Sequence, residues 1–565
     1  MNIQKHILIY LAILMFFLMW IRCSPKEPLS PQAEKGKKII RHEENIVTRE
    51  VWESDKTHII AAEISISRTV LRIKPGTTIQ FERDAAISVI DSAGLIADGS
   101  EQPIIFSTDI AEKGAWKYIY FADNALHDSC KLINCQIEFG GGDNSRGAAI
   151  YCDNASPIIT GCTITHGPLS GVNLIGDCRG IKFEDNTISN FDFAPVQTYA
   201  CNVSAMGNNT YVENGLNQIR IIEGSVTFND TWQNPSVPYR MADGLTIKSA
   251  KLTIKPAVTL LFEYDEGAMI SENGSLQAIG NQSERIIFTG SDIGRWKGIY
   301  FNASANDVNS KLVDCVIQYG GQDSNHPANI ILEDASPEIS SCLIRQSIGY
   351  GVYISGKIKQ GSLNNNTITN NAMAPISTSA NSVKGLSPGT YLGNGMDVIE
   401  VRGGLDEERV IEDGFWDNLG IPYRINGIVQ IQSSTLILAP GITIQMAAGS
   451  SFEVLIQGGF IADGTLEMIT IEGVQSTLGF WNHIYFSNLA NANNCQLVSC
   501  QICYGGGDIN RPGMIYCDNV SPTIRNCNIE YSLTYGIYLK GNAEIADLQS
   551  NFFNGNGYGN YCKSP

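Results

Sequence analysis

Basic residues are scarce in this chain, and charged residues of either sign are few. Lysine and arginine number 39 against 57 aspartates and glutamates, so the formal net charge is −18, and charged residues make up only 17% of the sequence. The acidic balance excludes a nucleic-acid partner, because nucleic-acid-binding proteins need a basic surface for the phosphates. A hydrophobic fraction of 43% excludes a disordered chain, since that much apolar surface drives formation of a core.

Long hydrophobic runs are few as well. Residues 7–21 form a continuous apolar run, shorter than the roughly 18 residues that a membrane-spanning helix needs. We therefore expect a signal peptide at residues 1–22 and a Pro/Lys/Glu-rich tether at 23–45. No second such run follows, so the remainder is expected to be soluble.

A cysteine just after the expected signal peptide predicts how the chain is attached to the membrane. Cys23 directly follows the signal core, and this arrangement resembles the bacterial lipoprotein signal, in which the cysteine thiol is acylated. Arg22 departs from the small residue usual before that cysteine. A secretory signal cleaved elsewhere and an uncleaved anchor helix are the alternatives. We expect export to the cell envelope or surface, with a lipid on Cys23 as the membrane contact.

A long internal repeat organises the rest of the chain. The segment WKYIYF at Trp116–Phe121 recurs as Trp296–Phe301 and as Trp481–Phe486, at offsets of 180 and 185 residues. Cysteines, prolines and asparagines recur at the same offsets. We number the copies repeat 1 (46–224), repeat 2 (225–404) and a shorter repeat 3 (405–565), and expect them to form one continuous solenoid.

A finer period within each repeat predicts the fold class. Cys135 and Cys162 are 27 residues apart, Cys162 and Asn186 are 24 apart, and the other copies keep both spacings. Segments of three to five residues with period-two alternation, divided by Gly, Asn, Asp and Pro, are short strands and not helices. A turn of about 24 residues favours an all-β parallel coil of about 20 turns over a β-propeller, whose blades need about 45 residues.

These residues carry a resemblance to a known family. The run from KPGTTIQF through WKYIYF, NCQIEFGGGDN and DNTISN resembles the right-handed parallel β-helix repeat family of bacterial and archaeal surface proteins, which has the pectin-lyase-like fold. The resemblance covers about residues 46–565. It implies the fold strongly and an activity weakly, because the family includes lyases, glycosidases, adhesins and proteins with no assigned reaction.

The recurring cysteines and asparagines are expected to be structural. Cys152 and Cys517 align with Leu332, so a buried apolar side chain suits that position and a thiol there acts as a small hydrophobe. We expect Cys135 and Cys162 to be stacked, unbonded interior residues. Asparagines at coil corners adopt left-handed conformations and bond neighbouring turns, which is the role expected of the three asparagines Asn186, Asn366 and Asn551.

Two sets of residues are candidates for binding. Each repeat has a glycine-rich turn that ends in aspartate and is followed ten residues later by another carboxylate, which pairs Asp143 with Asp153, Asp323 with Glu333, and Asp508 with Asp518. Paired carboxylates favour Ca²⁺, although Gly and Asp are also ordinary turn formers. The second set, Trp116, Trp296 and Trp481, offers either sugar-stacking rings or plain packing.

No catalytic motif identifies an enzyme. The clustered NTD, DD and GHG motifs of polygalacturonase-like hydrolases are missing, as are the pectate-lyase patterns, and the seven histidines do not cluster in the sequence. Catalytic residues stay unassigned, and no cofactor other than Ca²⁺ is indicated. We expect a non-catalytic scaffold or adhesion protein with a polysaccharide or cell-surface glycan as partner. The alternative is a lyase or glycoside hydrolase acting on an acidic or complex polysaccharide.

Overall fold

The computed structural model describes residues 37–291, 296–404 and 409–565. The expected signal peptide, the acylation site Cys23 and most of the expected tether lie outside these residues. No helix within the described ranges is long and apolar enough to cross a membrane. The helices among the described residues are short 3₁₀ segments, the longest being η2 (Ala200–Ala205) and η4 (Ala380–Gly385).

The strands follow the alternation of the sequence. Strand β6 (Thr78–Phe81) buries Ile79 and Phe81 and leaves the side chains between them half-buried. Strand β27 (Thr259–Phe262) repeats the pattern with Leu260 and Phe262. Because successive side chains of a strand point to opposite faces, one apolar side chain in two is enough to fill the inside of a coil.

The described residues divide into two compact units, one of residues 37–172 and 186–192 and the other made of the described residues among 173–185 and 193–565. In the first unit, successive strands join three parallel sheets in strict rotation. One sheet contains β2 (Glu50–Trp52), β5 (Val70–Ile73), β8 (Gly94–Asp98), β11 (Cys130–Ile133) and β14 (Ile158–Thr160). The next contains β1 (Lys38–His42), β3 (Lys56–Ile60), β6, β9 (Ile104–Ser107), β12 (Cys135–Glu138), β15 (Thr163–Thr165) and β18 (Thr187–Ser189). The third contains β4 (Glu63–Ser67), β7 (Ala86–Ile90), β10 (Ile119–Phe121) and β13 (Ala148–Asp153).

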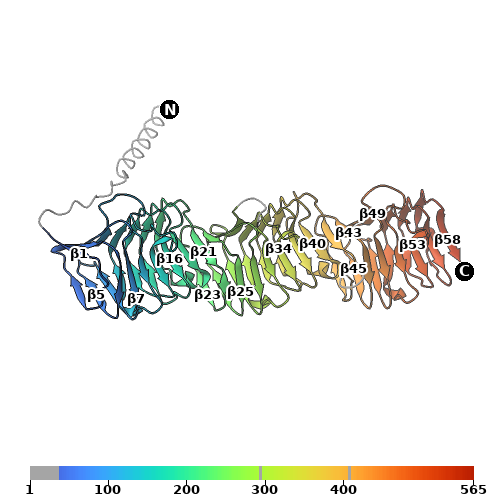
Figure 1. Cartoon of the computed structure of the whole chain (residues 1–565). Helices are drawn as coiled ribbons and strands as arrows, with labels where there is room; N and C mark the ends of the chain where they lie inside the picture. Colours follow the sequence, from blue (N-terminus) through green and yellow to red (C-terminus); the bar gives the residue numbers. More distant parts are fainter. Residues whose placement is uncertain (1–36, 292–295, 405–408) are drawn as a thin grey trace, which may run out of the picture. The chain divides into compact units, whose positions relative to one another are not determined.

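The second unit repeats this construction, and Figure 1 shows its strands stacked side by side in successive turns. Its longest sheet, which we call sheet D, runs from β22 (Ser225–Val226) to β57 (Phe552–Asn554). Alongside repeat 2, sheet D is joined by a sheet from β23 (Asp230–Trp232) to β38 (Leu363–Asn364). A further sheet contributes strands from β19 (Val196–Tyr199), at the end of repeat 1, to β39 (Thr367–Thr369). In repeat 3, sheet D is joined by a sheet from β42 (Gly414–Trp416) to β54 (Thr523–Arg525) and by sheet F, from β44 (Ile428–Ile431) to β58 (Gly559–Ser564).

Asparagine side chains connect neighbouring turns, as expected. Asn186 accepts a hydrogen bond from the Cys162 amide at 2.9 Å and donates to the Ile159 carbonyl at 2.9 Å. Asn366 makes the same two bonds in repeat 2 and Asn551 makes them in repeat 3. The left-handed conformation belongs to the preceding residue in the first two copies, with φ of 57° at Asp185 and 52° at Asn365.

The stacked cysteines lie inside the coil as thiols. Cys135 and Cys162 are each 1% exposed and occupy neighbouring turns, since β12 pairs in register with β15. The Cys162 thiol donates to the Leu132 carbonyl at 3.3 Å, and Cys342 and Cys527 make the equivalent bond at 3.2 and 3.3 Å. Both cysteines of the first pair are unbonded, which confirms the expectation for Cys135 and Cys162.

One expected boundary is wrong. Residues 23–45 were expected to form a tether, but Lys38–His42 form strand β1, which pairs in parallel with β3 along its whole length. The ordered coil therefore includes residues before position 46. Backbone pairing explains the difference, because an exposed strand edge accepts a further strand even where its side chains are polar.

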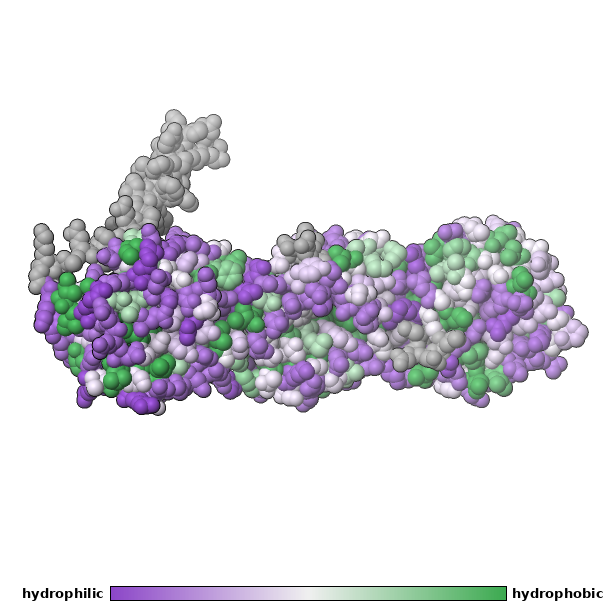
Figure 2. Space-filling view, viewed as in Figure 1, coloured by the Kyte–Doolittle hydropathy of each residue, from purple (hydrophilic) through white to green (hydrophobic). Residues whose placement is uncertain are grey.

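The surface of the molecule is predominantly polar. On the face drawn in Figure 2, apolar residues form separate small patches between polar ones. The exposed large apolar side chains are likewise spread over many turns, with Leu466, Val308 and Ile509 among the most exposed. Scattered apolar residues of this kind are normal for a protein surface.

Candidate functional site

Each repeat places one tyrosine on the outside of the strand that follows its recurring tryptophan. These strands are β10, β31 (Ile299–Phe301) and β50 (Ile484–Phe486), and in each the Ile and Phe are buried while the central tyrosine faces outward. The glycine-rich turn after the next strand but one folds back over the same face. We call the resulting surface the tyrosine face of that repeat.

The three tryptophans do not belong to this outer surface. Trp116, Trp296 and Trp481 are all 0% exposed, so no ring face is open to a sugar, and the expectation of a stacking platform is wrong. Each indole nitrogen donates to a backbone carbonyl at 2.8 Å, that of Glu138, Gln318 or Cys503. Two of the rings also stack on core phenylalanines, with 4.2 Å between the centroids of Phe81 and Trp116 and 4.6 Å between those of Phe262 and Trp296.

Burial of the tryptophan explains the glycine-rich turn. A Cβ on Gly140 would lie 2.6 Å from the Trp116 ring, and one on Gly505 would lie 2.7 Å from Trp481. The second glycine of each turn has a positive φ, 94° at Gly141 and 79° at Gly506. Glycine is therefore required for close approach and for a left-handed backbone. The turn covers the indole and carries its aspartate to the tyrosine face.

In repeat 1 an arginine is held between two tyrosines. The Arg146 guanidinium lies 4.5 Å from the ring centroid of Tyr118 and 4.3 Å from that of Tyr120. Asp143 lies 3.8 Å from Arg146 and accepts hydrogen bonds from Ser145. Burial opposes ionisation of Asp143, but these bonds and the charge of Arg146 outweigh it and lower its pKa.

Asp153 lies at the other end of the same array. The Tyr120 hydroxyl donates to Asp153 Oδ2 at 3.2 Å. Burial, followed by the charge and hydrogen bond of Asp153, raises the pKa of Tyr120. The structure therefore brings Asp143 and Asp153 to one face, as the sequence predicted, but with Tyr120 and Arg146 beside them.

Repeat 2 has a related array with histidine in place of arginine. Glu333 accepts a hydrogen bond from the Tyr300 hydroxyl. Asp323 accepts hydrogen bonds from the backbone amides of Asn325 and His326, and the His326 ring lies 4.9 Å from that of Tyr353. Burial and then the Glu333 hydrogen bond raise the pKa of Tyr300.

A small pocket opens on this face of repeat 2. It has a volume of about 190 Å³, and the side chains of Asp243, Glu266, Lys297 and Tyr300 contribute to its lining. Burial, and then the charge of Asp243, raise the pKa of Glu266, although Lys297 opposes the shift. This pocket therefore contains a carboxyl group that holds its proton more tightly than usual.

Repeat 3 has the most elaborate charge cluster. The Arg511 guanidinium lies 4.2 Å from the Tyr485 ring centroid and donates to Glu453 Oε1 at 3.0 Å. His483 is 2% exposed, with Nδ1 3.7 Å from Asp508 Oδ2 and Nε2 3.9 Å from Glu453 Oε1. The contact with His483 lowers the pKa of Glu453 to about 2 against burial, with hydrogen bonds from Gln430 and Arg511 adding to the effect.

Beyond this cluster, the tyrosine face of repeat 3 continues as a row. The ring centroids of Tyr485 and Tyr516 are 5.8 Å apart, and those of Tyr516 and Tyr538 are 5.1 Å apart with an interplanar angle of 15°. The row follows the strand register, since these three tyrosines are paired neighbours in β50, β53 (Gly513–Asp518) and β56 (Tyr535–Lys540). Lys540 Nζ donates to Asp518 Oδ2 at 3.3 Å.

Some of the residues beside the tyrosines are not among the candidates identified from the sequence, although the repeats do mark the basic position. Arg146, His326 and Arg511 all follow the turn aspartate by three residues, so an alignment of the repeats identifies a basic position. His483 and Glu453 gave no such signal, because Gly298 and Met269 occupy their places in repeat 2. Only the register of the strands brings them together.

The paired carboxylates do not converge on one point with a third ligand. No group of three or more His, Cys, Asp or Glu side chains suited to a metal ion occurs in the described ranges. Asp143 and Asp153 instead bond to neighbouring hydroxyl and amide groups. Ca²⁺ binding by the six carboxylates stays a prediction.

Comparison with known proteins agrees with the strand arrangement. No curated protein matches this sequence. Residues 81–244 match a family model described as a right handed beta helix region. The parallel strands of the described residues extend the same construction over the rest of the chain. The chain is therefore a right-handed parallel β-helix repeat protein of the all-β class.

Proposed function

We propose that this chain is an exported, lipid-anchored surface protein that binds glycans on its tyrosine faces and catalyses no reaction. The observation that carries the proposal is the recurrence, in all three repeats, of outward tyrosines beside a basic residue and a carboxylate. The signal-like segment and Cys23 support export and anchoring.

The chemistry of these faces suits a sugar. Aromatic rings pack against the apolar side of a pyranose, while charged groups at the edges bond its hydroxyls. Tyrosine hydroxyls are protonated at neutral pH and can donate hydrogen bonds to a sugar, and the pKa values of Tyr120 and Tyr485 are raised further still. Burial is the first cause of both shifts. The cations and carboxylates already hold one another in place, which lowers the entropic cost of ordering them when a ligand binds.

The faces of repeats 2 and 3 act separately. Tyr300 lies in sheet D, whereas the equivalent Tyr485 lies in sheet F. Sheet D continues into repeat 3, where it contains β52 (Cys500–Cys503). This strand is not the counterpart of β31 but of another strand of the same turn. A straight polymer lying along one sheet therefore cannot meet both tyrosine faces. We expect single-site affinities with little gain from avidity between these two repeats.

Binding is tested by electrophoresis of the mature chain through gels that contain polysaccharide. Tyr538→Ala removes one ring of the row in repeat 3, and we expect it to reduce the retardation seen with the wild type. Tyr264→Ala is the matched control, because Tyr264 is 60% exposed and does not belong to the row in repeat 3. Equal retardation of all three proteins, with unchanged melting temperatures, contradicts the role of this row.

The anchor is tested separately. Cys23→Ser removes the thiol that would carry the lipid, and we expect the protein to move from the membrane fraction to the soluble fraction. Metabolic labelling with a fatty acid gives an independent measurement. Retention of the variant in membranes would instead favour an uncleaved helix at residues 7–21.

A second function, a glycoside hydrolase or polysaccharide lyase, is favoured by the small pocket of repeat 2. Glu266 has a raised pKa beside the charge of Asp243, and hydrolases use one protonated and one ionised carboxyl group as acid and base. Release of reducing sugar by the wild type but not by Glu266→Gln would support hydrolysis. New absorbance from unsaturated ends would support a lyase.

A further inference from the structure

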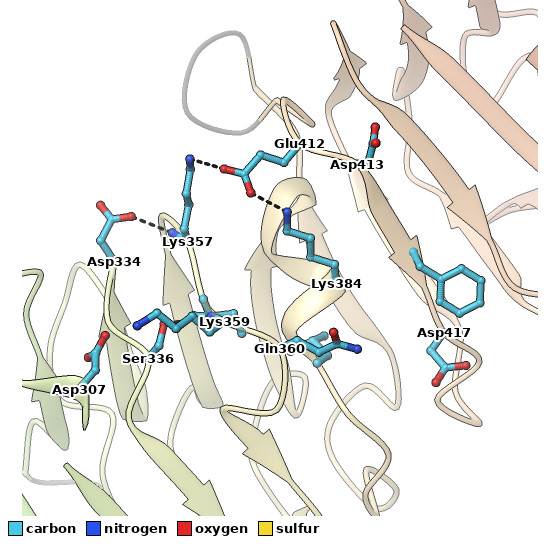
Figure 3. A pocket seen from close by; sticks show the side chains of 13 residues that line it. Asp307, Asp334, Ser336, Lys357, Lys359, Gln360, Lys384, Glu412, Asp413 and Asp417 are labelled. Carbon is cyan, nitrogen blue, oxygen red and sulfur yellow. Dashed lines mark hydrogen bonds and ion pairs between the residues drawn. The ribbon is translucent and has the colours of Figure 1, made fainter. Parts of the chain in front are cut away.

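A second concave surface lies away from the tyrosine faces, where repeat 2 meets repeat 3 in the second compact unit. It is a groove of about 850 Å³. Its walls are the turn after β34 (Ala328–Glu333), the turn after β37 (Tyr350–Ser355), the 3₁₀ turn η4 and the outer side of β42. Figure 3 shows its polar side chains, with Lys359, Gln360 and Lys384 at the centre.

Three charged groups brace one wall of the groove. Glu412 accepts hydrogen bonds from Lys357 Nζ at 2.6 Å and from Lys384 Nζ at 2.7 Å, as Figure 3 shows. These bonds, that from Lys357 first, lower the pKa of Glu412 to about 2. The Asp334 side chain accepts from the Lys357 amide at 2.8 Å, so Lys357 is held both by its side chain and by its backbone.

Two charged side chains in the groove have an atom without a hydrogen-bond partner among the described residues. Within the described part of the chain, Lys359 Nζ makes neither a hydrogen bond nor an ion pair, although its backbone amide bonds Ser336. Asp307 Oδ1 is shielded from solvent and has no hydrogen-bond partner. In Figure 3, Lys359 extends toward the side of the groove where Asp307 and Ser336 lie. Lys359 Nζ is therefore a donor that a ligand in the groove can use, whereas Asp307 Oδ1 is closed to it.

The groove also has an apolar surface. Phe415 is 50% exposed and faces outward from β42, between the buried Gly414 and Trp416. It lines the groove together with Leu386. A half-exposed aromatic ring in the same groove as an unpaired lysine amine is a combination that suits a chain of polyhydroxylated rings.

We propose that this groove is a separate binding site for a neutral saccharide. Lys359 donates to a hydroxyl of one sugar unit, and Phe415 packs against the apolar side of another. This inference rests on the proposed glycan binding and adds the ligand class. Five carboxylates against three lysines line the groove and the chain has a net charge of −18, so a uronate polymer is repelled where a neutral glycan is not.

The test is isothermal titration calorimetry of the mature chain with short oligosaccharides. Neutral probes are manno-, xylo- and cello-hexaose, and acidic probes are oligogalacturonate and oligomannuronate. Lys359→Ala and Phe415→Ala remove one ligand contact each. The controls are Lys251→Ala, at another exposed lysine, and Phe552→Ala, at a phenylalanine that is 57% exposed.

We expect at least one neutral probe to bind, with Kd weakened about tenfold or more in Lys359→Ala and Phe415→Ala and unchanged in the controls. Binding that both groove variants leave unchanged overturns the groove site but leaves the proposed function standing, and Tyr538→Ala then identifies the tyrosine face. Tighter, Lys359-dependent binding of uronates overturns the neutral ligand class. Failure of every oligosaccharide and polysaccharide to bind overturns both proposals.

Discussion

Replacing Asn366 by alanine tests whether the asparagine column holds successive turns together. Asn366 is 1% exposed, and its amide satisfies two backbone groups in the preceding turn, the Cys342 N–H at 2.9 Å and the Ile339 carbonyl at 2.8 Å. Alanine leaves both groups buried without partners. Since each such group costs about 1–3 kcal/mol, Asn366→Ala is expected to reduce the free energy of unfolding by about 2–6 kcal/mol.

Two further substitutions refine this expectation. Asn366→Asp keeps the acceptor for Cys342 but needs a proton to donate to Ile339, so its folded-state pKa is raised. The variant is therefore more stable at low pH and loses stability as the pH rises toward neutrality. Asn551→Ala is expected to cost less, because Asn551 is 9% exposed and water reaches part of the freed groups.

The assay combines urea unfolding with hydrogen exchange read by mass spectrometry. Solenoids unfold locally, so the peptide that contains Cys342 is expected to lose protection before distant peptides do. Asn364→Ala is the control, because Asn364 is an exposed neighbour in β38. Unchanged exchange at Cys342 together with a loss below about 0.5 kcal/mol would refute the role given to buried backbone groups.

Three other predictions follow from the packing and the charges. Gly140→Ala places a Cβ 2.6 Å from the Trp116 ring and is expected to cost about 1–3 kcal/mol in urea unfolding, whereas Gly414→Ala, whose Cβ meets nothing within 3.8 Å, serves as its control. Because the folded-state pKa of Glu453 is lowered to about 2, its contribution of about 3 kcal/mol to stability is present above pH ~4.5 and is lost as the pH falls toward 2. Glu453→Gln should therefore reduce the loss of stability between pH ~4.5 and 2, and an unchanged loss argues against this role. Cys135 and Cys162 are 1% exposed, so iodoacetamide should label them only in denaturant, and labelling of the native protein would contradict their burial.

The sequence by itself determined the turn of the solenoid. Alternating apolar residues in strands of three to five residues, spaced 24–27 apart, leave little besides a parallel coil, because each strand is too short to form a core without its neighbours. The repeat offsets also identified the asparagine column, since Asn186, Asn366 and Asn551 hold the same position relative to the stacked cysteines. These features are local and periodic, so the order of residues along the chain is enough to reveal them.

The tertiary structure decided what lies beside what. Trp116 is buried because the Gly140 turn folds over it, and no pattern within its own strand distinguishes that from an exposed ring. His483 and Glu453 are 30 positions apart and meet only because β47 (Ser451–Val454) and β50 are paired neighbours. Tyr300 and Tyr485 likewise lie in different sheets, because a 3₁₀ segment, η4, replaces a strand between them. Such a change of register is set by three-dimensional packing and not by the period of the sequence.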